Sequence, residues 1–552
     1  MKFTYIHHHY KNGLKKMNFI TKNKITKNKK CYLILLPVLA ALIIALIPTL
    51  KQQWPLGWDI IYHVHYAQIY AQYGFTLTDP LLNSPYGQKI GYMPLFHFLI
   101  AAIGTVFGVD FMQVARFLQP VLAASIILSV SYVAYRFYGE IAGVGAGFLM
   151  LSSYLVSRIV LSLPENLALI FIPLAVYLYY SSIKNKNYRT AFLGGLLFII
   201  VLFTHNAATL CLSLTIVSIT VLELVVFRDF GVLKNFIFFF LSLILIAVAG
   251  IVALQIWAPQ TLQNVIQQGI TATTGISTSL PSNRPLGLLS FLGNIGVLVL
   301  IFSITGSVLA VIKHRRKDLI LIVWILAMLL LSNAYWFGIN VISYRVLIYL
   351  LIPLSIVGGY AISYAYQWMK TSDKFSSKKL RIGFLVVILG LSFVSGVMTV
   401  ENPKVSNFYV KNEFETVQIA PPSTSEIELA EWFQENGNES RSFVISNQFT
   451  GMFIVTRAGM PMNYGFEFYS IKNYPNMTIS KLKEDNIGYL VYDKRLVFPS
   501  EDNYTYIRSI QSEFFPLYYF SQNITTHFDE IKPDYATKVY ENQDYIVCKI
   551  DY

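Results

Sequence analysis

The segment around Asp59 combines the residue types needed for acid–base chemistry. It reads W-P-L-G-W-D-I-I-Y-H-V-H-Y-A-Q-I-Y-A-Q-Y-G over residues 54–74. On a helix, one face would carry a polar and aromatic stripe made of Asp59, Tyr62, His63, Tyr66 and Tyr70. That spacing predicts an interfacial helix with a carboxylate and an imidazole within mutual reach. The alternative is an ordinary amphipathic surface helix whose Tyr and Trp side chains anchor at lipid headgroups.

A second acidic candidate, Glu165, lies in S-R-I-V-L-S-L-P-E-N at residues 157–166. Pro164 followed by an acidic residue is also typical of a plain helix N-terminus, where the acid complements the helix dipole. Arg158 stands one short loop away, and two roles are open to it. It can pair with Glu165, or it can hold a lipid phosphate.

Two more polar positions interrupt apolar runs further along the chain. His205-Asn206, in F-T-H-N-A-A, begins a loop in which we expect Asn206 to cap a helix and His205 to make a polar contact. Arg345, in S-Y-R-V-L-I-Y-L-L-I-P, is the only charged residue between Asp318 and Lys370. Arg345 is either a functional cation or a residue whose side chain extends to the lipid headgroups.

The composition identifies the setting of these residues as a membrane. The chain is 55% hydrophobic and 13% charged, far from the balance of a soluble protein of 552 residues. Residues 400–552 hold 13 Lys and Arg against 21 Asp and Glu, whereas the preceding 399 hold 30 basic and 9 acidic residues. The basic residues are scattered through short loops between apolar runs, which excludes a nucleic-acid-binding face.

Eleven apolar windows of spanning length follow one another along the chain. They are residues 32–50, 112–137, 141–156, 165–183, 190–204, 207–227, 235–257, 289–312, 319–332, 342–367 and 382–400. A twelfth window, 92–107, is expected to lie along the surface. If it crossed the membrane, the basic loops Lys184–Arg189, Lys313–Lys317 and Lys374–Arg381 would lie opposite the basic N-terminus.

This reading predicts a polytopic α-helical membrane protein with about eleven transmembrane helices. A basic cytoplasmic tail spans 1–31, a transmembrane domain spans 32–400, and interfacial helices lie in a long external loop, 51–111. An odd number of spans puts residues 401–552 outside the cell. The nine acidic residues of the membrane part then divide by side: Asp59, Asp79, Asp110 and Glu165 are external, whereas Glu140, Glu223, Asp229, Asp318 and Asp373 are at or near the cytoplasmic side.

The C-terminal region, 401–552, has the pattern of a small extracytoplasmic α/β domain. Helices are expected at Ser425–Gln434, behind Ser423, and at Ile479–Asp485, strands at Ser442–Ser446 and Gly488–Tyr492, and a closing hairpin at Val539-Tyr540 and Tyr545–Ile550. Four Asn-X-Ser/Thr sequons, at Asn438, Asn476, Asn503 and Asn523, all fall in this region, as an exported domain would show.

At Asp59, His63 and Pro164-Glu165 the sequence resembles the GT-C superfamily of membrane glycosyltransferases, which use polyprenyl-phosphate-linked sugars. The resemblance implies inversion at the anomeric carbon. Attack by an acceptor hydroxyl on the external face needs a base, and a partly desolvated carboxylate can serve. Asp59 is the candidate, with Glu165 orienting the acceptor or sharing the task. A leaving lipid phosphate needs cationic partners, and Arg345, Arg158, His205 and His63 are the candidates. The expected partners are the lipid-linked donor, the bilayer and an acceptor glycan, lipid or protein.

The chain departs from the oligosaccharyltransferase members of that superfamily. Their W-W-D-Y-G motif has only a distant echo in Met462-Asn463-Tyr464-Gly465, and their metal-binding D-x-D-like pair is replaced by Pro164-Glu165. The protein O-mannosyltransferase and aminoarabinose-transferase side of the superfamily is the closer resemblance. No cofactor is expected, and a divalent metal is left open.

Two other function classes fit the same topology. A transporter or flippase of lipid-linked sugars would place ionisable residues near mid-membrane and break paired helices at Gly or Pro. A non-catalytic cell-envelope assembly subunit would use only the exported domain. Under any of these readings the external loop 258–288, with Arg284, has the composition of a flexible gate.

Overall fold

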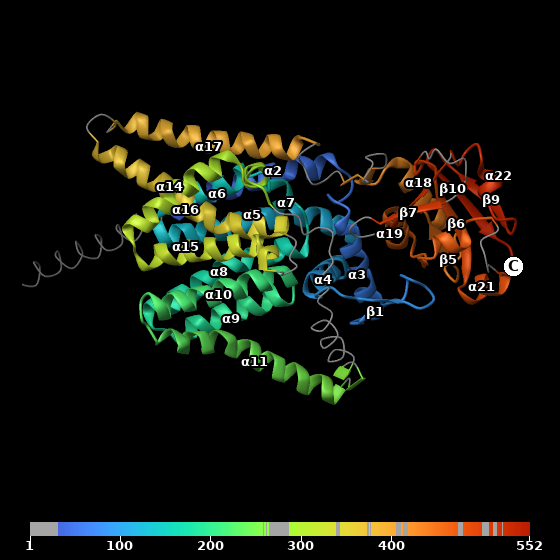
Figure 1. The fold of residues 1–552 in the computed structure, drawn as a ribbon, viewed down its shortest axis with the longest axis horizontal. Coiled ribbons are helices and arrows are strands. Elements are labelled where there is room, and N and C mark those ends of the chain that lie inside the picture. Colours follow the sequence, from blue (N-terminus) through green and yellow to red (C-terminus); the bar gives the residue numbers. More distant parts are fainter. Residues whose placement is uncertain are drawn as a thin grey trace, which may run out of the picture.

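The computed structural model shows a helical bundle joined to a C-terminal α/β domain (Figure 1). It describes residues 31–552 except 258, 261, 264–285, 338–342, 373–374, 376, 404–409, 412–417, 473–477, 499–506, 512–515 and 522. Most of the predicted N-terminal tail and of the loop 258–288, including Arg284, and the sequons at Asn476 and Asn503 therefore lie outside the described residues.

Long apolar helices form the bundle, as the composition predicts. Their bounds are α2 (Leu35–Lys51, after the short helix η1, Cys31–Ile34), α5 (Phe111–Tyr138), α6 (Glu140–Ser152), α7 (Val156–Ile159), α8 (Pro164–Asn185), α9 (Tyr188–Leu202), α10 (Asn206–Val225), α11 (Val232–Trp257), α13 (Leu288–Ile295), α14 (Val297–Lys313), α15 (Arg316–Ser332), η2 (Ala334–Phe337), α16 (Ser343–Thr371) and α17 (Lys378–Glu401). Within the described part of the chain, seven of these helices are long and apolar enough to cross a membrane, or eight if the bent pair α13–α14 counts as one span. Helices cover most of the described part of each window expected to span, and the shorter α6, α9 and α15 pack against the long helices.

One predicted span, 289–312, is broken in the structure. Helices α13 and α14 meet at an angle of 106° at Gly296, whose φ of +90° is a conformation that L side chains rarely adopt. An apolar window reports hydrophobicity but not backbone direction, so the sequence pattern did not reveal the bend.

Glycines allow the central helices to pack backbone against backbone. A Cβ on Gly306 of α14 would lie 2.1 Å from the carbonyl oxygen of Val357 on α16. A Cβ on Gly359 of α16 would lie 2.3 Å from the carbonyl oxygen of Ala142 on α6. Helix α16 is consequently buried along most of its length, and it forms the centre of the bundle.

Ion pairs join the helices at the end of the bundle remote from the C-terminal domain. Arg316 at the start of α15 pairs with Glu223 of α10 and with Asp229 just beyond it. Asp318 pairs with Arg315 (2.6 Å between Oδ2 and Nε) and accepts a hydrogen bond from the Tyr138 hydroxyl. These contacts explain the three carboxylates as charge-balancing structural groups.

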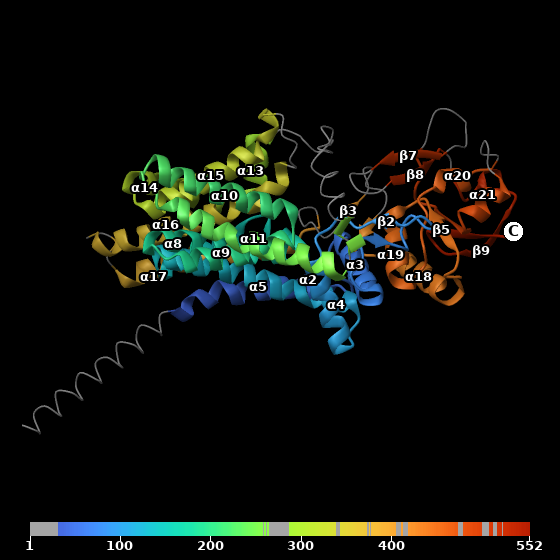
Figure 2. The same cartoon turned by 90° about the horizontal axis from the view of Figure 1, so that it is seen from below.

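The predicted external loop forms a compact unit at the opposite end of the bundle, which we call the domain end. It contains α3 (Asp59–Tyr73), the two-residue strands β1 (Thr78–Asp79) and β2 (Gln88–Lys89), and α4 (Leu95–Phe107). Helix α4, which covers the twelfth window, packs on α3 and α5 (Figure 2). Its alignment relative to the membrane stays a prediction.

The C-terminal domain is built around a four-stranded sheet. Its remaining elements are α18 (Thr424–Asn436), β5 (Ser442–Ile445), α19 (Gln448–Ala458), α20 (Phe466–Tyr469), α21 (Ile479–Glu484), β6 (Ile487–Asp493), β7 (Ile507–Gln511), β8 (Pro516–Phe520), α22 (Phe528–Ile531), β9 (Ala536–Glu541) and β10 (Tyr545–Ile550), preceded by β3 (Val410–Lys411) and β4 (Gln418–Ala420). The sheet order is β5-β6-β10-β9, with β5 and β6 parallel and the other pairs antiparallel. The predicted helices, strands and closing hairpin are all confirmed.

Backbone pairing fastens this domain to the external loop. Met462 forms bridges with both Leu82 and Phe443, so the segment around it lies between the loop and strand β5. Met462 N donates to Leu81 O at 2.8 Å, and Asn463 Nδ2 donates to Ser84 O at 2.6 Å. The M-N-Y-G segment thus has a structural role, joining the domain to the loop that carries Asp59.

Candidate active site

Asp59 is the first residue of α3, at the domain end of the bundle. Burial raises the pKa of its carboxyl group, and the charges of Arg158 and Arg345 act in the opposite direction. No described residue donates a hydrogen bond to this carboxylate. Asp59 is therefore a partly desolvated carboxylate near two guanidinium groups, with its oxygens available to a substrate.

Glu165 and Arg158 form a buried ion pair beside Asp59. Arg158 Nε lies 2.6 Å from Glu165 Oε2, and the two side chains are 17% and 2% exposed. Of the two roles considered for Arg158, pairing with Glu165 is confirmed. The bond uses only Nε, and no described residue accepts a hydrogen bond from the two terminal nitrogens, which remain available to an anion.

Asn166 holds the backbone that presents Arg158. Its buried Nδ2 donates to the carbonyl oxygens of Arg158, Ile159 and Leu161 at 2.9, 2.8 and 2.6 Å. The sequence carries no signal for this role, because an Asn after Pro-Glu is ordinary at a helix N-terminus. Only the fold shows that it ties α8 to the short helix α7.

His205, and not Asn206, caps helix α10. His205 Nδ1 accepts a hydrogen bond from Ala208 N at 3.3 Å, whereas Asn206 is the first residue of the helix. The capping role expected of Asn206 is wrong, because the helix begins at Asn206 itself, one residue earlier than a cap at this position would require. Nδ1 also lies 3.2 Å from the Tyr349 hydroxyl, which is near Glu165.

These contacts define the tautomer of His205. Burial lowers the pKa of His205 despite the neighbouring Glu165 carboxylate, which favours the neutral imidazole. A neutral ring that accepts a hydrogen bond at Nδ1 carries its proton on Nε2. His205 can accordingly donate one hydrogen bond from Nε2 to a substrate oxygen.

A cavity of about 320 Å³ lies beside these groups. It is enclosed by the loop after β2, the start of α10 and the start of α16, and it is lined by Gly91, Tyr92, Met93, His205, Arg345 and Tyr349 among others. Tyr92 is within electrostatic range of Asp59, Glu165, Arg158 and Arg345. Two of the four proposed phosphate-binding residues therefore line one cavity next to both carboxylates.

His63 is more buried than Arg158, His205 and Arg345, the other three proposed phosphate-binding residues. Its Nδ1 is 3.0 Å from His97 Nε2, and both rings are buried, with Tyr92 packed edge-on against His63. Burial lowers the pKa of both imidazoles, to about 3 for His97. His63 is therefore neutral, is paired with His97, and packs against Tyr92, which lines the cavity. Direct contact between His63 and a donor phosphate stays a prediction.

The described residues include no group of three or more His, Cys, Asp and Glu side chains arranged to hold a metal ion. Asp59 and Glu165 are each next to arginines, whose positive charges disfavour a cation at the same place. The chemistry of this site is thus that of one available carboxylate, one paired carboxylate and several donors suited to an anion.

Comparison with solved structures identifies the fold. The AglB oligosaccharyltransferase of Archaeoglobus fulgidus, in complex with an inhibitory peptide and a dolichol-phosphate, matches with a TM-score of 0.59 and 12% identity over 85% of this chain and 70% of its own. ArnT of Cupriavidus metallidurans bound to undecaprenyl phosphate matches with a TM-score of 0.57 and 12% identity over 94% and 97%. The mycobacterial arabinofuranosyltransferase AftD matches with a TM-score of 0.55 and 14% identity over 93% and 40%.

These three proteins share the GT-C fold, and the structural resemblance expected from Asp59, His63 and Pro164-Glu165 is confirmed at the level of the fold. No family model and no curated protein sequence matches the chain. At 12–14% identity the likeness concerns architecture: a polytopic helical membrane protein with a C-terminal α/β domain.

Proposed function

We propose that this protein is a membrane glycosyltransferase that moves a sugar from a polyprenyl-phosphate-linked donor to an acceptor hydroxyl at the external face. The observation that carries the proposal is an uncommitted, partly desolvated Asp59 carboxylate within electrostatic range of the guanidinium groups of Arg158 and Arg345. The solved neighbours add that this fold accommodates dolichol-phosphate and undecaprenyl phosphate.

The reaction assigns a separate task to each group. Asp59 accepts the proton of the acceptor hydroxyl as its oxygen attacks the anomeric carbon from the face opposite the phosphate, so that the configuration inverts. The bond between the anomeric carbon and the phosphate oxygen breaks, and the lipid phosphate leaves with an added negative charge. Arg345, the terminal nitrogens of Arg158 and Nε2–H of His205 stabilise that charge.

Glu165 has a positioning task in this scheme. Its carboxylate is buried and paired with Arg158, so it holds the guanidinium group in place for the phosphate. The Tyr349 hydroxyl, between His205 and Glu165, links the same network to the cavity. The orientation of an acceptor by Glu165 is therefore indirect, through Arg158 and Tyr349.

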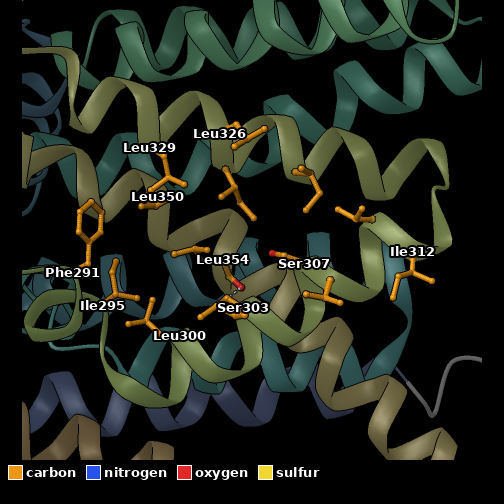
Figure 3. A pocket seen from close by; sticks show the side chains of 15 residues that line it. Phe291, Ile295, Leu300, Ser303, Ser307, Ile312, Leu326, Leu329, Leu350 and Leu354 are labelled. Atoms are coloured by element: carbon orange, nitrogen blue, oxygen red, sulfur yellow. Dashed lines mark hydrogen bonds between the residues drawn. The ribbon is translucent and has the colours of Figure 1, made fainter. Parts of the chain in front are cut away.

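An apolar groove can bind the lipid tail of the donor. It has a volume of about 540 Å³ and lies between α14, α15 and α16, lined by Phe291, Leu300, Leu326, Leu329, Leu350 and Leu354 among others (Figure 3). Arg345 and Tyr349 line the polar cavity, and Leu350 and Leu354 continue along the same helix into the groove. A phosphate at Arg345 and an isoprenoid chain along α16 would thus be joined by about one helical turn.

The test is transfer of radiolabel from polyprenyl-phosphate sugars in membranes that contain matched amounts of each variant. Asp59→Asn is expected to reduce transfer roughly 100- to 10,000-fold, the usual contribution of a general base. The matched control is Asp110→Asn, since Asp110 is a partly exposed helix cap in the same loop and Asn also caps helices. It should retain full transfer.

The same variants separate catalysis from folding. Ionised Asp59 is destabilising in the folded state because its pKa is raised, so Asp59→Asn should unfold at the same temperature as wild type or higher at neutral pH. Transfer that is indifferent to Asp59→Asn would overturn the catalytic assignment. Label that crosses the bilayer on its lipid without transfer would instead favour a flippase.

A further inference from the structure

Two sequons of the C-terminal domain are folded in a way that exposes their acceptor atoms. Asn438-Glu439-Ser440 lies in the turn between α18 and β5, and Asn523-Ile524-Thr525 lies in the turn between β8 and α22. Both asparagines are exposed. No described residue accepts a hydrogen bond from the Nδ2 amide of either one.

The side-chain carbonyl oxygen of each asparagine accepts hydrogen bonds from the third residue of its sequon. Asn438 Oδ1 accepts from Ser440 N at 3.0 Å and from Ser440 Oγ at 2.7 Å. Asn523 Oδ1 accepts from Thr525 N at 2.9 Å. An amide nitrogen is a poor nucleophile because its lone pair is delocalised into the carbonyl group. Hydrogen bonds to Oδ1 stabilise negative charge on that oxygen, so they make an Nδ2 proton easier for a base to remove as the nitrogen attacks.

Both turns are anchored, so the asparagines are presented outward. Asn438 N donates to the Tyr489 hydroxyl at 3.1 Å, and Arg441 N donates back to Asn438 O at 2.8 Å. Beside Asn523, Ile524 is fully buried in the domain core, which directs its neighbours to the surface. These sites are rigid turns with free amide nitrogens.

The surface next to Asn438 also has room for a sugar. An open polar cavity of about 630 Å³ is lined by Asn436, Asn438, Arg441, Lys549, Asp551 and Tyr552. Its amide, guanidinium, ammonium and carboxylate groups are hydrogen-bonding partners for hydroxyls. The Arg441 guanidinium carbon lies 4.6 Å from the centroid of the Tyr552 ring, and this contact holds both side chains at the edge of the cavity.

We propose that Asn438 and Asn523 are sites of N-linked glycosylation, modified by a separate asparagine glycosyltransferase of the same membrane. In that reaction Nδ2 forms a bond to the anomeric carbon of a lipid-linked oligosaccharide, and the bond from that carbon to the lipid phosphate breaks. The phosphate leaves as an anion, and a base of the transferase takes the amide proton. The inference rests on the external placement of the domain and not on the activity proposed above for this chain.

The test uses the full-length protein purified from its native membranes and intact glycopeptide mass spectrometry. Peptides containing Asn438 and Asn523 are expected to carry glycan mass. The mass at 438 should be lost in Asn438→Gln and in Ser440→Ala, which keeps the asparagine, and should return in Ser440→Thr. Asn436→Gln is the matched control, because Asn436 borders the same cavity but begins no sequon, and it should keep the glycan.

Unmodified asparagines at both positions would overturn the inference, and so would a glycan at Asn438 that persists in Ser440→Ala. The Asp59→Asn variant makes the two proposals distinguishable. It should lose sugar transfer yet keep both glycans. If it lost the glycans as well, the chain would be modifying itself, and the assignment to a separate enzyme would be wrong.

Discussion

At the scale of single residues, the site depends on one carboxylate that is left available and one that is not. Asp59 accepts no hydrogen bond from the described residues, whereas Glu165 is paired with Arg158 in a buried bond of 2.6 Å. Two acids that are equivalent in the sequence therefore have different environments. Under the proposed function, this difference favours Asp59 for the proton transfer and Glu165 for the positioning task.

The pH dependence of transfer should report Asp59. A base must be ionised, so transfer should fall as the pH drops through the pKa of Asp59, which burial raises above the ordinary aspartate value of 3.8. Because the charge of Arg158 lowers that pKa, Arg158→Met should move the acidic limb to higher pH. The measurement is the pH profile of kcat/KM. An acidic limb that stays in place would argue that another group is the base.

The Arg158–Glu165 pair should couple strongly in stability. Removing one member leaves a buried charge without compensation, at a cost of about 3–5 kcal/mol. Arg158→Met is expected to lower the free energy of unfolding by that order, and the double variant Arg158→Met/Glu165→Gln by clearly less. Unfolding in lipid nanodiscs measures both. Strictly additive losses would contradict a buried, directly bonded pair.

At the scale of elements, the position of α16 determines which residues reach the site. It contributes Arg345 and Tyr349 to the polar cavity and Leu350 and Leu354 to the apolar groove. Its depth in the bundle depends on the close glycine contacts with α14 and α6. Small residues at helix crossings thus control how α16 presents Arg345 and Tyr349 to the cavity.

A bulky side chain at the α14–α16 crossing should consequently disturb the bundle. In Gly306→Leu the new Cβ would meet Val357 O at 2.1 Å, so the helices must separate, typically at a cost of 1–3 kcal/mol. Gly390→Leu on α17 is the matched control, since a Cβ there has no atom within 4 Å among the described residues. Thermal unfolding in detergent compares them. Equal stability of the two variants would show that the crossing is looser than the structure has it.

At the scale of the whole molecule, the C-terminal domain and the external loop act as one body. Bridges from Met462 to Leu82 and to Phe443 extend the domain toward the loop that carries Asp59. Tyr86 adds a hydrogen bond from the loop to Asp485 of the domain, at 2.5 Å. These contacts predict that the domain stays attached to the external loop during turnover.

A disulfide across this junction tests that conclusion. Leu82 and Met462 are bridge partners and fully buried, so Leu82→Cys/Met462→Cys should form a disulfide with little strain. The oxidised double variant is expected to retain wild-type transfer. Each single cysteine variant is the control for lost packing. Transfer that disappears on oxidation and returns on reduction would mean that the domain must separate from the loop during turnover.

Several features of this protein follow from the sequence because they depend on local pattern. Apolar runs and scarce charge predict the helical bundle, and the N-cap and alternation signals of residues 423–550 predict the elements of the C-terminal domain. The rarity of acids before residue 400 directs attention to Asp59 and Glu165. These patterns can be recognised without knowledge of long-range contacts, since each is a property of a few consecutive residues.

Only the tertiary structure decided how the distant pieces meet. Asn166, Tyr349 and His97 have no local signal, because their roles come from partners on other helices or in other turns. The break at Gly296 and the cap at His205 depend on backbone direction, which hydrophobicity does not encode. The sequence named the candidates for chemistry, whereas packing determined which carboxylate is left available and which cations face it, because burial and pairing are properties of three-dimensional neighbours.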